Sequence, residues 1–232
     1  MPQRPYVLLS AAVSVDGYID DATPDRLILS GEADLDRVDE VRAGVDAILV
    51  GAGTIRADNP RLLVRSAARR AARAGRGEPA SPARVTLTSR GGLDPAARFF
   101  TARPGSGLEG GPGERLVYAA APAAGPVRAE LAGTGATVVP IGGGGLAWVL
   151  ADLAGRGVGR LLVEGGSGVL TGFLAQGLAD ELQLMVAPFF VGGGVRLTGR
   201  GAYPHGPGRP MQLAQVAALG DAVLLRYLLP AP

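Results

Sequence analysis

Short apolar runs recur along the chain, and most of them end near a glycine, an aspartate or a proline. Such runs with such endings are typical of buried strands. The pattern predicts strands over Tyr6–Val13, Ala47–Val50, Val85–Thr88, Leu116–Ala119, Thr137–Ile141, Arg160–Glu164, Leu182–Val191 and Val223–Leu229. Helices are expected over Val127–Leu131, over Leu146–Leu153 and from the glycines at 165–168 to about Gln176.

A further helix is expected over Gly31–Ala43, where apolar residues recur at helical spacing. Ser30 is suited to cap this helix, and Glu32 lies in its first turn, near the positive end of the helix dipole. The apolar face consists of Leu35, Val38, Val41 and Val45. Charged residues line the rest: Asp34, Asp36, Arg37, Asp39, Glu40 and Arg42.

Strands that alternate with helices predict an α/β fold. No helix is expected between the last two strands, which favours a mixed, mostly parallel sheet with an antiparallel C-terminal edge. Pro188 lacks an amide donor, so the strand that contains it is expected at an edge or a bulge. The segments Ser66–Pro82 and Gly105–Gly113 are interpreted as surface loops, and a single domain is expected over residues 1–232.

Composition excludes several chemistries. The chain has no cysteine and no lysine, and His205 is its one histidine. These absences exclude thiolate nucleophiles, zinc–thiolate sites, Schiff-base lysines and the Walker-A lysine, and no metal is expected. A net charge of +2 and the arginine-only basic residues do not by themselves indicate nucleic acid. No apolar run is long enough to span a membrane, and the N-terminus resembles a strand more than a signal peptide, so a cytoplasmic protein is expected.

The strongest local signal for chemistry is the segment Leu161–Leu174. A buried strand there ends in Glu164, turns through Gly165, Gly166, Ser167 and Gly168, and opens a helix. Such a turn allows a pyrophosphate to approach backbone amides, although a plain tight turn is the favoured interpretation on the turn alone. Its glycine spacing also differs from the usual dinucleotide-binding pattern. A carboxylate that ends an apolar strand, however, lies where α/β sheets bind ligands.

Two further segments follow strands. After Val50, Gly51 and Gly53 offer a second nucleotide contact, Thr54 and Asp58 share a helical face, and the Asn59-Pro60 pair is expected to end that helix. Arg61 and Arg65 follow and are suited to phosphate, or to a solvated surface.

Ser89 and Arg90 directly follow the strand that ends at Thr88. A hydroxyl and a guanidinium there are what a ribose 2′-phosphate needs, although a surface turn is the simpler interpretation. The arginines between Arg65 and Arg84 are interpreted as a solvated loop rather than a polyanion site.

The motifs taken together resemble a known family. The ordered segments are Arg4–Val7, Ser14–Gly17, Ser30–Arg42, Asp46–Thr54, Asp58–Leu62, Leu162–Gly166, Leu178–Leu182 and Ala187-Pro188. They resemble the reductase half of the bifunctional riboflavin-biosynthesis deaminase/reductase and its free-standing archaeal and fungal relatives. The resemblance implies a fold similar to dihydrofolate reductase and a homodimer. It also implies NADPH-dependent reduction of a ribosylamino-pyrimidine 5′-phosphate to the ribitylamino product.

The resemblance also implies roles for individual residues. Those that match cofactor contacts are Ala12, Ile28, Thr54, Asp58, Ser89, Gly166, Ser167, Gly168, Val169, Leu170, Thr171 and Gly172. Those that match substrate contacts are Arg26, Arg42, Leu62, Arg65 and Glu164. Asp58 and Glu164 are the expected catalytic residues, with Asp58 suited to stabilise a cationic imine and Glu164 to accept from pyrimidine N–H groups.

Four departures from the bacterial pattern leave other substrates open. Ser10 stands where bifunctional members have lysine, Ile28 where they have an aromatic residue, and Asn59 where a second aspartate is common. Arg26 replaces a small polar residue. The alternatives are a reductase of the same fold that acts on a pterin or a secondary metabolite, and a non-catalytic nucleotide-binding homologue. The deaminase half is excluded, because its zinc site needs cysteine.

Overall fold

The computed structural model describes residues 4–230 apart from 22, 24, 26 and 103–112. The chain divides into two compact units. The first comprises Met1–Pro5 and Asp39–Leu162, and the second comprises Tyr6–Val38 and Val163–Pro232. Two elements pass from one unit to the other: helix α1 (Glu32–Ala43) and strand β7 (Arg160–Gly165).

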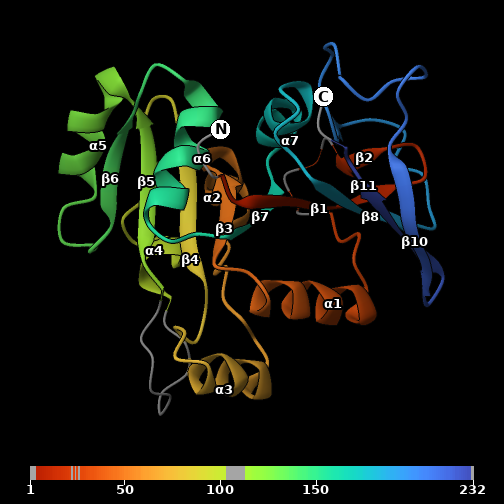
Figure 1. Ribbon diagram of the computed structural model, residues 1–232, viewed down its shortest axis with the longest axis horizontal. Helices are drawn as coiled ribbons and strands as arrows, with labels where there is room; N and C mark the ends of the chain where they lie inside the picture. The colour runs from red at the N-terminus through yellow and green to blue at the C-terminus, as the bar shows by residue number, and fades with distance from the viewer. Residues whose placement is uncertain (1–3, 22, 24, 26, 103–112, 231–232) are drawn as a thin grey trace. The chain divides into compact units, whose positions relative to one another are not determined.

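The first unit contains a parallel sheet. Its strands are β3 (Ala47–Gly51), β4 (Ala83–Thr88), β5 (Arg115–Ala120) and β6 (Thr137–Ile141), which lie side by side in this order (Figure 1). Gly51 pairs with Leu87, and Thr88 pairs with Ala119, so the carboxyl ends of β3, β4 and β5 meet at one edge. Strands β3, β4 and β5 are buried along most of their length because the unit's helices cover them.

The helices of the first unit are α2 (Ala52–Asp58), α3 (Ala67–Gly75), α4 (Arg98–Thr101), α5 (Ala124–Glu130) and α6 (Gly145–Gly155), with a short 3₁₀ turn η1 (Ala121–Ala123). The apolar face of α6 is fully buried through Val149, Leu150 and Leu153. Its Asp152 accepts a hydrogen bond of 2.6 Å from the hydroxyl of buried Tyr118 on β5. This hydrogen bond therefore holds the helix against the sheet in addition to its apolar contacts.

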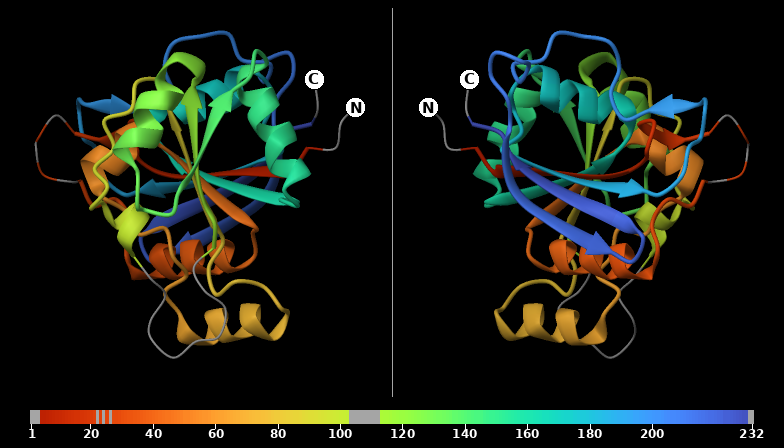
Figure 2. Two further views of the ribbon diagram at one scale, coloured as in Figure 1. Left: turned by 90° about the vertical axis from the view of Figure 1, so that its left-hand side faces the viewer. Right: turned by 90° about the vertical axis from the view of Figure 1, so that its right-hand side faces the viewer.

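The second unit contains a mixed sheet with strand order β10-β11-β8-β1. Strand β1 (Tyr6–Ser14) runs parallel to β8 (Glu181–Ala187), and β11 (Ala222–Leu228) runs antiparallel to β8. Strand β10 (Gln212–Leu219) forms a hairpin with β11 (Figure 2, right). Two short strands, β2 (Tyr18–Asp20) and β9 (Val195–Arg196), pair separately, and helix α7 (Ser167–Ala175) follows β7. The expected mostly parallel sheet with an antiparallel C-terminal edge is confirmed.

The expectation for the strand around Pro188 was wrong. Strand β8 ends at Ala187 and is paired on both sides, with β1 and β11, so it is not an edge strand. Pro188 ends the strand instead of lying in it, since a residue without an amide donor cannot continue the ladder. The edge of this sheet is β10, which the sequence pattern did not predict because half of its apolar residues are alanines and the others are interspersed with Gln212 and Gln215.

The segment Ser66–Pro82 is not simply a surface loop. It contains helix α3, whose start is capped by Ser66, the hydroxyl of which accepts a hydrogen bond from the Arg69 amide. Arg73 is buried and donates from Nη1 to Ala43 O (3.0 Å) and Val45 O (2.9 Å). The compositional signal was misleading here because arginine can be buried when backbone carbonyls satisfy its guanidinium. The other expected loop, Gly105–Gly113, lies outside the described residues except for Gly113.

Helix α1 begins at Glu32, close to the expected start, but its buried face is partly acidic. Asp34 and Asp39 are only 3% and 2% exposed, whereas Leu35 is 40% exposed. The buried carboxylate of Asp34 has polar partners: it accepts hydrogen bonds from Ser30 Oγ (2.5 Å) and from Arg37 Nη2 (2.7 Å). Some charged residues of this helix are therefore buried and form hydrogen bonds inside the protein, instead of facing solvent.

Candidate active site

In the first unit, the strand–helix turn after β3 holds several expected site residues. Gly51 ends β3 and precedes α2 without a side-chain cap. Thr54 and Asp58 are half-buried on this helix, and Gly53 is exposed. Asn59 ends the helix in the left-handed conformation (φ 44°), and its Oδ1 accepts a hydrogen bond of 2.6 Å from the Arg98 amide. The helix end predicted at Asn59-Pro60 is confirmed, and this bond fixes it.

The turn after β4 presents Ser89 and Arg90 at the edge where β3 and β4 end. Both side chains are exposed. Arg90 makes no hydrogen bond or ion pair with any other residue that the structure describes. At the base of the same turn, Thr88 Oγ1 accepts a hydrogen bond of 2.9 Å from the Gly91 amide, and this bond closes the turn. A guanidinium without a partner on a closed turn is suited to an anionic ligand.

Three expected substrate contacts also lie in the first unit. Leu62 has a positive φ of 51° and is buried, so its side chain belongs to the core and its backbone is strained. Arg42 donates to Leu63 O over 3.2 Å and thereby supports this strained segment. Arg65 follows two residues later with its side chain 52% exposed. The guanidinium of Arg65 is the most accessible of these three groups.

Asp39 fixes the backbone beside Arg65. Its carboxylate accepts from the amides of Arg65 and Ser66, the latter over 3.0 Å, and from Arg69 Nη1 over 3.1 Å. Burial alone would raise the pKa of Asp39, but these hydrogen bonds and the charge of Arg65 outweigh it, and the pKa lies below its usual value. This role was not predictable from the sequence, because Asp39 and Arg65 are 26 residues apart and nothing in the helix pattern distinguishes Asp39.

In the second unit, Glu164 is half-buried near the end of β7 and is followed by two glycines with positive φ, Gly165 (154°) and Gly166 (85°). Gly166 is the residue before the first turn of α7, and no side chain caps that turn. The amides of Val169 and Leu170 donate back to Gly166 O at 2.9 and 3.0 Å. The amides of Ser167 and Gly168 are the ones left for a ligand, as at any helix start.

Some residues of α7 pack in the protein interior, and others border open space. Leu170 is buried in the core of the second unit, and Thr171 Oγ1 donates to Ser167 O and accepts from the Gly199 amide over 2.8 Å. A side chain at Gly168 would meet nothing within 4 Å, so open space adjoins the first turn. The expected cofactor contact at this turn therefore depends on Gly166–Gly168 more than on Leu170 or Thr171.

The remaining expected contacts of the second unit lie on or after β1. Ala12 is half-buried and pairs with Met185 of β8, while Ile28 is 76% exposed. Ser10 is buried, and Arg37 Nη2 donates to its Oγ over 3.4 Å. A guanidinium thus lies beside the position that departs from the bacterial pattern. Arg26 lies outside the described residues.

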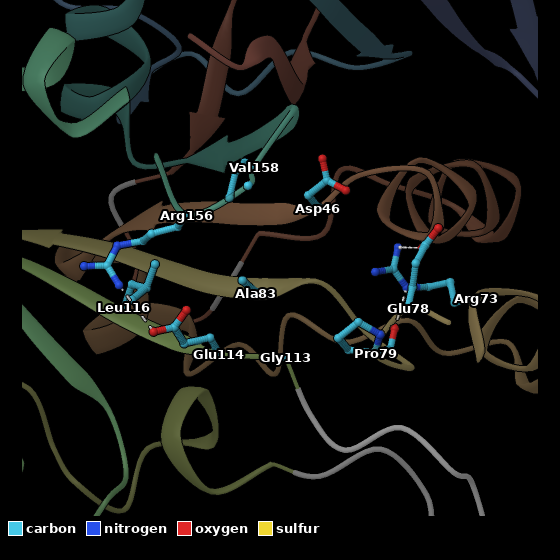
Figure 3. A pocket seen from close by; sticks show the side chains of 11 residues that line it. Asp46, Arg73, Glu78, Pro79, Ala83, Gly113, Glu114, Leu116, Arg156 and Val158 are labelled. Carbon is cyan, nitrogen blue, oxygen red and sulfur yellow. Dashed lines mark hydrogen bonds and ion pairs between the residues drawn. The ribbon is translucent and has the colours of Figure 1, made fainter. Parts of the chain in front are cut away.

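A pocket of about 200 Å³ lies at the opposite, amino-terminal edge of the first unit's sheet (Figure 3). Its charged side chains pair with one another: Arg73 lies 3.2 Å from Glu78, and Arg156 lies 3.5 Å from Glu114. Asp46 accepts from the amides of Gly159 and Arg160. None of the expected site residues lines this pocket, and the pairing of its charged side chains within the protein indicates a structural role.

Two searches over the described part of the chain bear on other functions. No helix there is long and apolar enough to cross a membrane. No group of three or more histidine, aspartate or glutamate side chains there is arranged to hold a metal ion.

The chain is similar to known reductases over most of its length. It is 38% identical over 82% of its length to the 2,5-diamino-6-ribosylamino-4(3H)-pyrimidinone 5′-phosphate reductase of Archaeoglobus fulgidus, and it covers 83% of that protein. It is 34% identical over 97% of its length to the reductase of the same name from Methanothermobacter thermautotrophicus, covering 98% of it.

Among solved structures, Acinetobacter baumannii RibD matches 97% of the chain with a TM-score of 0.77 and 26% identity. The chain spans only 58% of the length of that protein. This likeness confirms the expected fold class. A family model described as the RibD C-terminal domain matches residues 5–225. The chain therefore belongs to the RibD C-terminal domain family.

Proposed function

We propose that this protein reduces a ribosylamino-pyrimidine 5′-phosphate to the corresponding ribitylamino compound, with NADPH as the reductant, in riboflavin biosynthesis. The observation that carries the proposal is its similarity, over 82% and 97% of its length, to two archaeal proteins named for the reduction of such a substrate. The expected site residues are consistent with it, because they supply groups suited to phosphate, to a pyrimidine and to a dinucleotide.

The residues fit a phosphorylated nicotinamide cofactor in two places. At the start of α7, Gly166 and Gly168 leave backbone amides uncovered, as a pyrophosphate requires. At the end of β4, Ser89 and Arg90 offer a hydroxyl and a guanidinium for the 2′-phosphate that distinguishes NADPH from NADH. Gly51, Gly53 and Thr54 are proposed as further contacts, along with Ala12 and Ile28. When bound, NADPH would supply the hydride.

The proposed roles on the substrate side follow from charge. The exposed guanidinium of Arg65 binds the 5′-phosphate, and Arg42 and Leu62 support the segment that carries Arg65. Glu164 accepts hydrogen bonds from the N–H groups of the pyrimidine. The ring-opened substrate is an imine: C1′ gains the hydride, the π electrons of the C=N bond move to nitrogen, and that nitrogen ends as an amine. Asp58 stabilises the positive charge of the protonated imine.

The test is the oxidation of reduced nicotinamide by the purified protein. NADPH and NADH are each tested with the ribosylamino phosphates of the diaminopyrimidinone and of the aminouracil, and with dihydrofolate. Turnover of one ribosyl phosphate with NADPH is the expected result. Turnover of dihydrofolate alone would transfer the proposal to a pterin, and binding of NADPH without any turnover would favour an unidentified substrate or a non-catalytic role.

We also propose that the protein is a homodimer and that its subunits contact each other through the exposed face of the β10–β11 hairpin in the second unit. In the β10–β11 hairpin, Val216 pairs with Leu225 and Leu213 pairs with Tyr227, which places these apolar side chains on one face. Leu213 and Val216 are exposed, as is Val223 on the same face. Exposed apolar patches of this kind are typical of interfaces.

Light scattering tests the dimer. Val216→Glu is expected to lower the molar mass to that of the monomer, whereas Gln215→Glu, on the opposite face of β10, is expected to leave the dimer intact. A monomeric wild-type protein would contradict the proposal.

A further inference from the structure

The turn that carries Ser89 and Arg90 is held from three elements of the first unit. Thr88, at the end of β4, accepts from the Gly91 amide through its hydroxyl. Arg56, on α2, donates from Nη1 to Gly91 O over 3.1 Å. Glu130, on α5, accepts from the Gly92 amide over 3.2 Å. The main chain of Gly91 and Gly92 is thereby fixed, and the side chains of Ser89 and Arg90 extend from a preorganised turn.

The two glycines are required by this arrangement. Gly91 and Gly92 have φ values of 77° and 71°, a conformation that residues with side chains rarely adopt. A Cβ at Gly91 would lie 3.0 Å from both Glu130 Oε2 and Val127 Cγ2. A Cβ at Gly92 would lie 3.9 Å from Arg56 Nη1. The guanidinium of Arg56 therefore lies directly against the turn.

Arg56 keeps unused hydrogen-bonding capacity at this position. Its side chain is exposed, and its bond to Gly91 O uses one of five N–H donors. Within the part of the chain that the structure describes, the side chain of Arg56 makes no other hydrogen bond or ion pair, and the side chain of Arg90 makes none. Two guanidiniums with free donors therefore flank one turn.

The charge balance of the turn depends on Arg56. Arg56 and Arg90 carry one positive charge each, and Glu130 carries one negative charge against the same turn. Without Arg56, the charges of Arg90 and Glu130 cancel, and the site loses its net attraction for an anion. Arg56 is thus the residue that decides whether this turn attracts a phosphate.

We propose that Arg56 is a second guanidinium of the 2′-phosphate site and binds that phosphate together with Ser89 and Arg90. The inference rests on the proposed NADPH-dependent function and adds a residue to its cofactor site. It assigns to α2 a direct part in the choice between NADPH and NADH.

The test is the dissociation constant of NADPH and of NADH, measured by titration calorimetry for the wild-type protein and its variants. Adenosine 2′,5′-bisphosphate and AMP serve as probes of the 2′-phosphate alone. Arg56→Ala is expected to weaken NADPH and the bisphosphate about tenfold, the usual size of a lost charge-assisted contact, and to leave NADH and AMP within about twofold. Arg98→Ala, which removes an exposed arginine of α4 in the same unit, is the control for net charge and is expected to change neither.

Two conservative variants separate phosphate binding from support of the turn. Arg56→Lys keeps the charge and is expected to restore much of the NADPH preference. Arg56→Gln keeps a donor for Gly91 O without the charge and is expected to behave like Arg56→Ala. Full rescue by glutamine would overturn a phosphate contact, as would an unchanged NADPH-to-NADH ratio in Arg56→Ala. A wild-type protein that binds neither nucleotide would overturn the proposed function, and this inference with it.

Discussion

Asp39 and Arg65 are in contact although 26 residues separate them: the Arg65 amide donates to Asp39 Oδ1, and Arg65 Nε lies 3.7 Å from the same oxygen. The contact links helix α1 to the start of α3. Because Asp39 is 2% exposed and Arg65 is half exposed, the buried carboxylate fixes the backbone while the guanidinium stays accessible. This relationship explains how an exposed arginine, proposed above to bind the substrate's phosphate, is held in place.

Asp39→Asn is therefore expected to destabilise the protein by about 2 kcal/mol, since a charged acceptor of several hydrogen bonds is lost in a buried position. The free energy of unfolding is measured by urea denaturation. Glu40→Gln, on the exposed side of the same helix, is the control and is expected to have little effect.

The same pair predicts a pH dependence. The pKa of Asp39 is lowered in the folded state, so its contribution to stability is fully present above its unfolded pKa of about 3.9 and is lost as the pH falls through the folded value. The difference between wild type and Asp39→Asn is expected to be constant from neutral pH down to about pH 5 and to shrink below about pH 4. A difference that grew on acidification would contradict the assignment.

Gly166→Ala is expected to cost about 1–3 kcal/mol of stability, because φ 85° and ψ 110° lie outside the regions that residues with a Cβ adopt. Gly168→Ala is the matched variant. It lies inside α7 with open space around it, so its stability is expected to rise by up to about 1 kcal/mol. If the start of α7 binds the pyrophosphate, both variants weaken NADPH binding. Unchanged NADPH affinity in both would contradict that role.

Glu164→Gln is expected to lower turnover while leaving the dissociation constant of NADPH nearly unchanged, because the carboxylate is assigned to the pyrimidine. Steady-state kinetics give the first quantity and fluorescence titration the second. An equal loss of both would refute the assignment of Glu164 to the substrate.

Ser89→Ala and Arg90→Ala are expected to weaken NADPH more than NADH, with the larger effect for Arg90, whose charge-assisted contact is the stronger. The measurement is the dissociation constant of NADPH and of NADH for the wild-type protein and each variant. An unchanged preference in the Arg90 variant would remove the 2′-phosphate from this turn.

Most strands of the first unit were predictable from sequence because they are buried and appear as short apolar runs, as Ala47–Gly51 and the centre of Arg115–Ala120 illustrate. Strand β10 was missed because one of its faces carries glutamines and the other leaves Leu213 and Val216 exposed. Helix α3 was missed because a composition of alanine, arginine and glycine favours a solvated loop, although its alanines and arginines segregate onto different sides of a helix.

The candidate site was predictable only where it consists of local motifs, such as the glycines after β7 and the Ser89-Arg90 pair. The supporting contacts were not. Asp39 with Arg65, Arg56 with Gly91 and Glu130 with Gly92 each join residues at least 26 positions apart. Such pairs are brought together by the packing of helices on the sheet, and no spacing in the sequence indicates them.

The transfer of the hydride can be followed directly with an isotope label. The protein is incubated with the diaminopyrimidinone ribosylamino phosphate, or its aminouracil counterpart, and NADPH that carries deuterium at the transferring position of nicotinamide C4. The predicted result is a ribitylamino product with one deuterium at C1′, detected by mass spectrometry and NMR. Consumption of NADPH without deuterium at C1′, or recovery of unreduced substrate at full enzyme occupancy by both ligands, would rule out the proposed reduction.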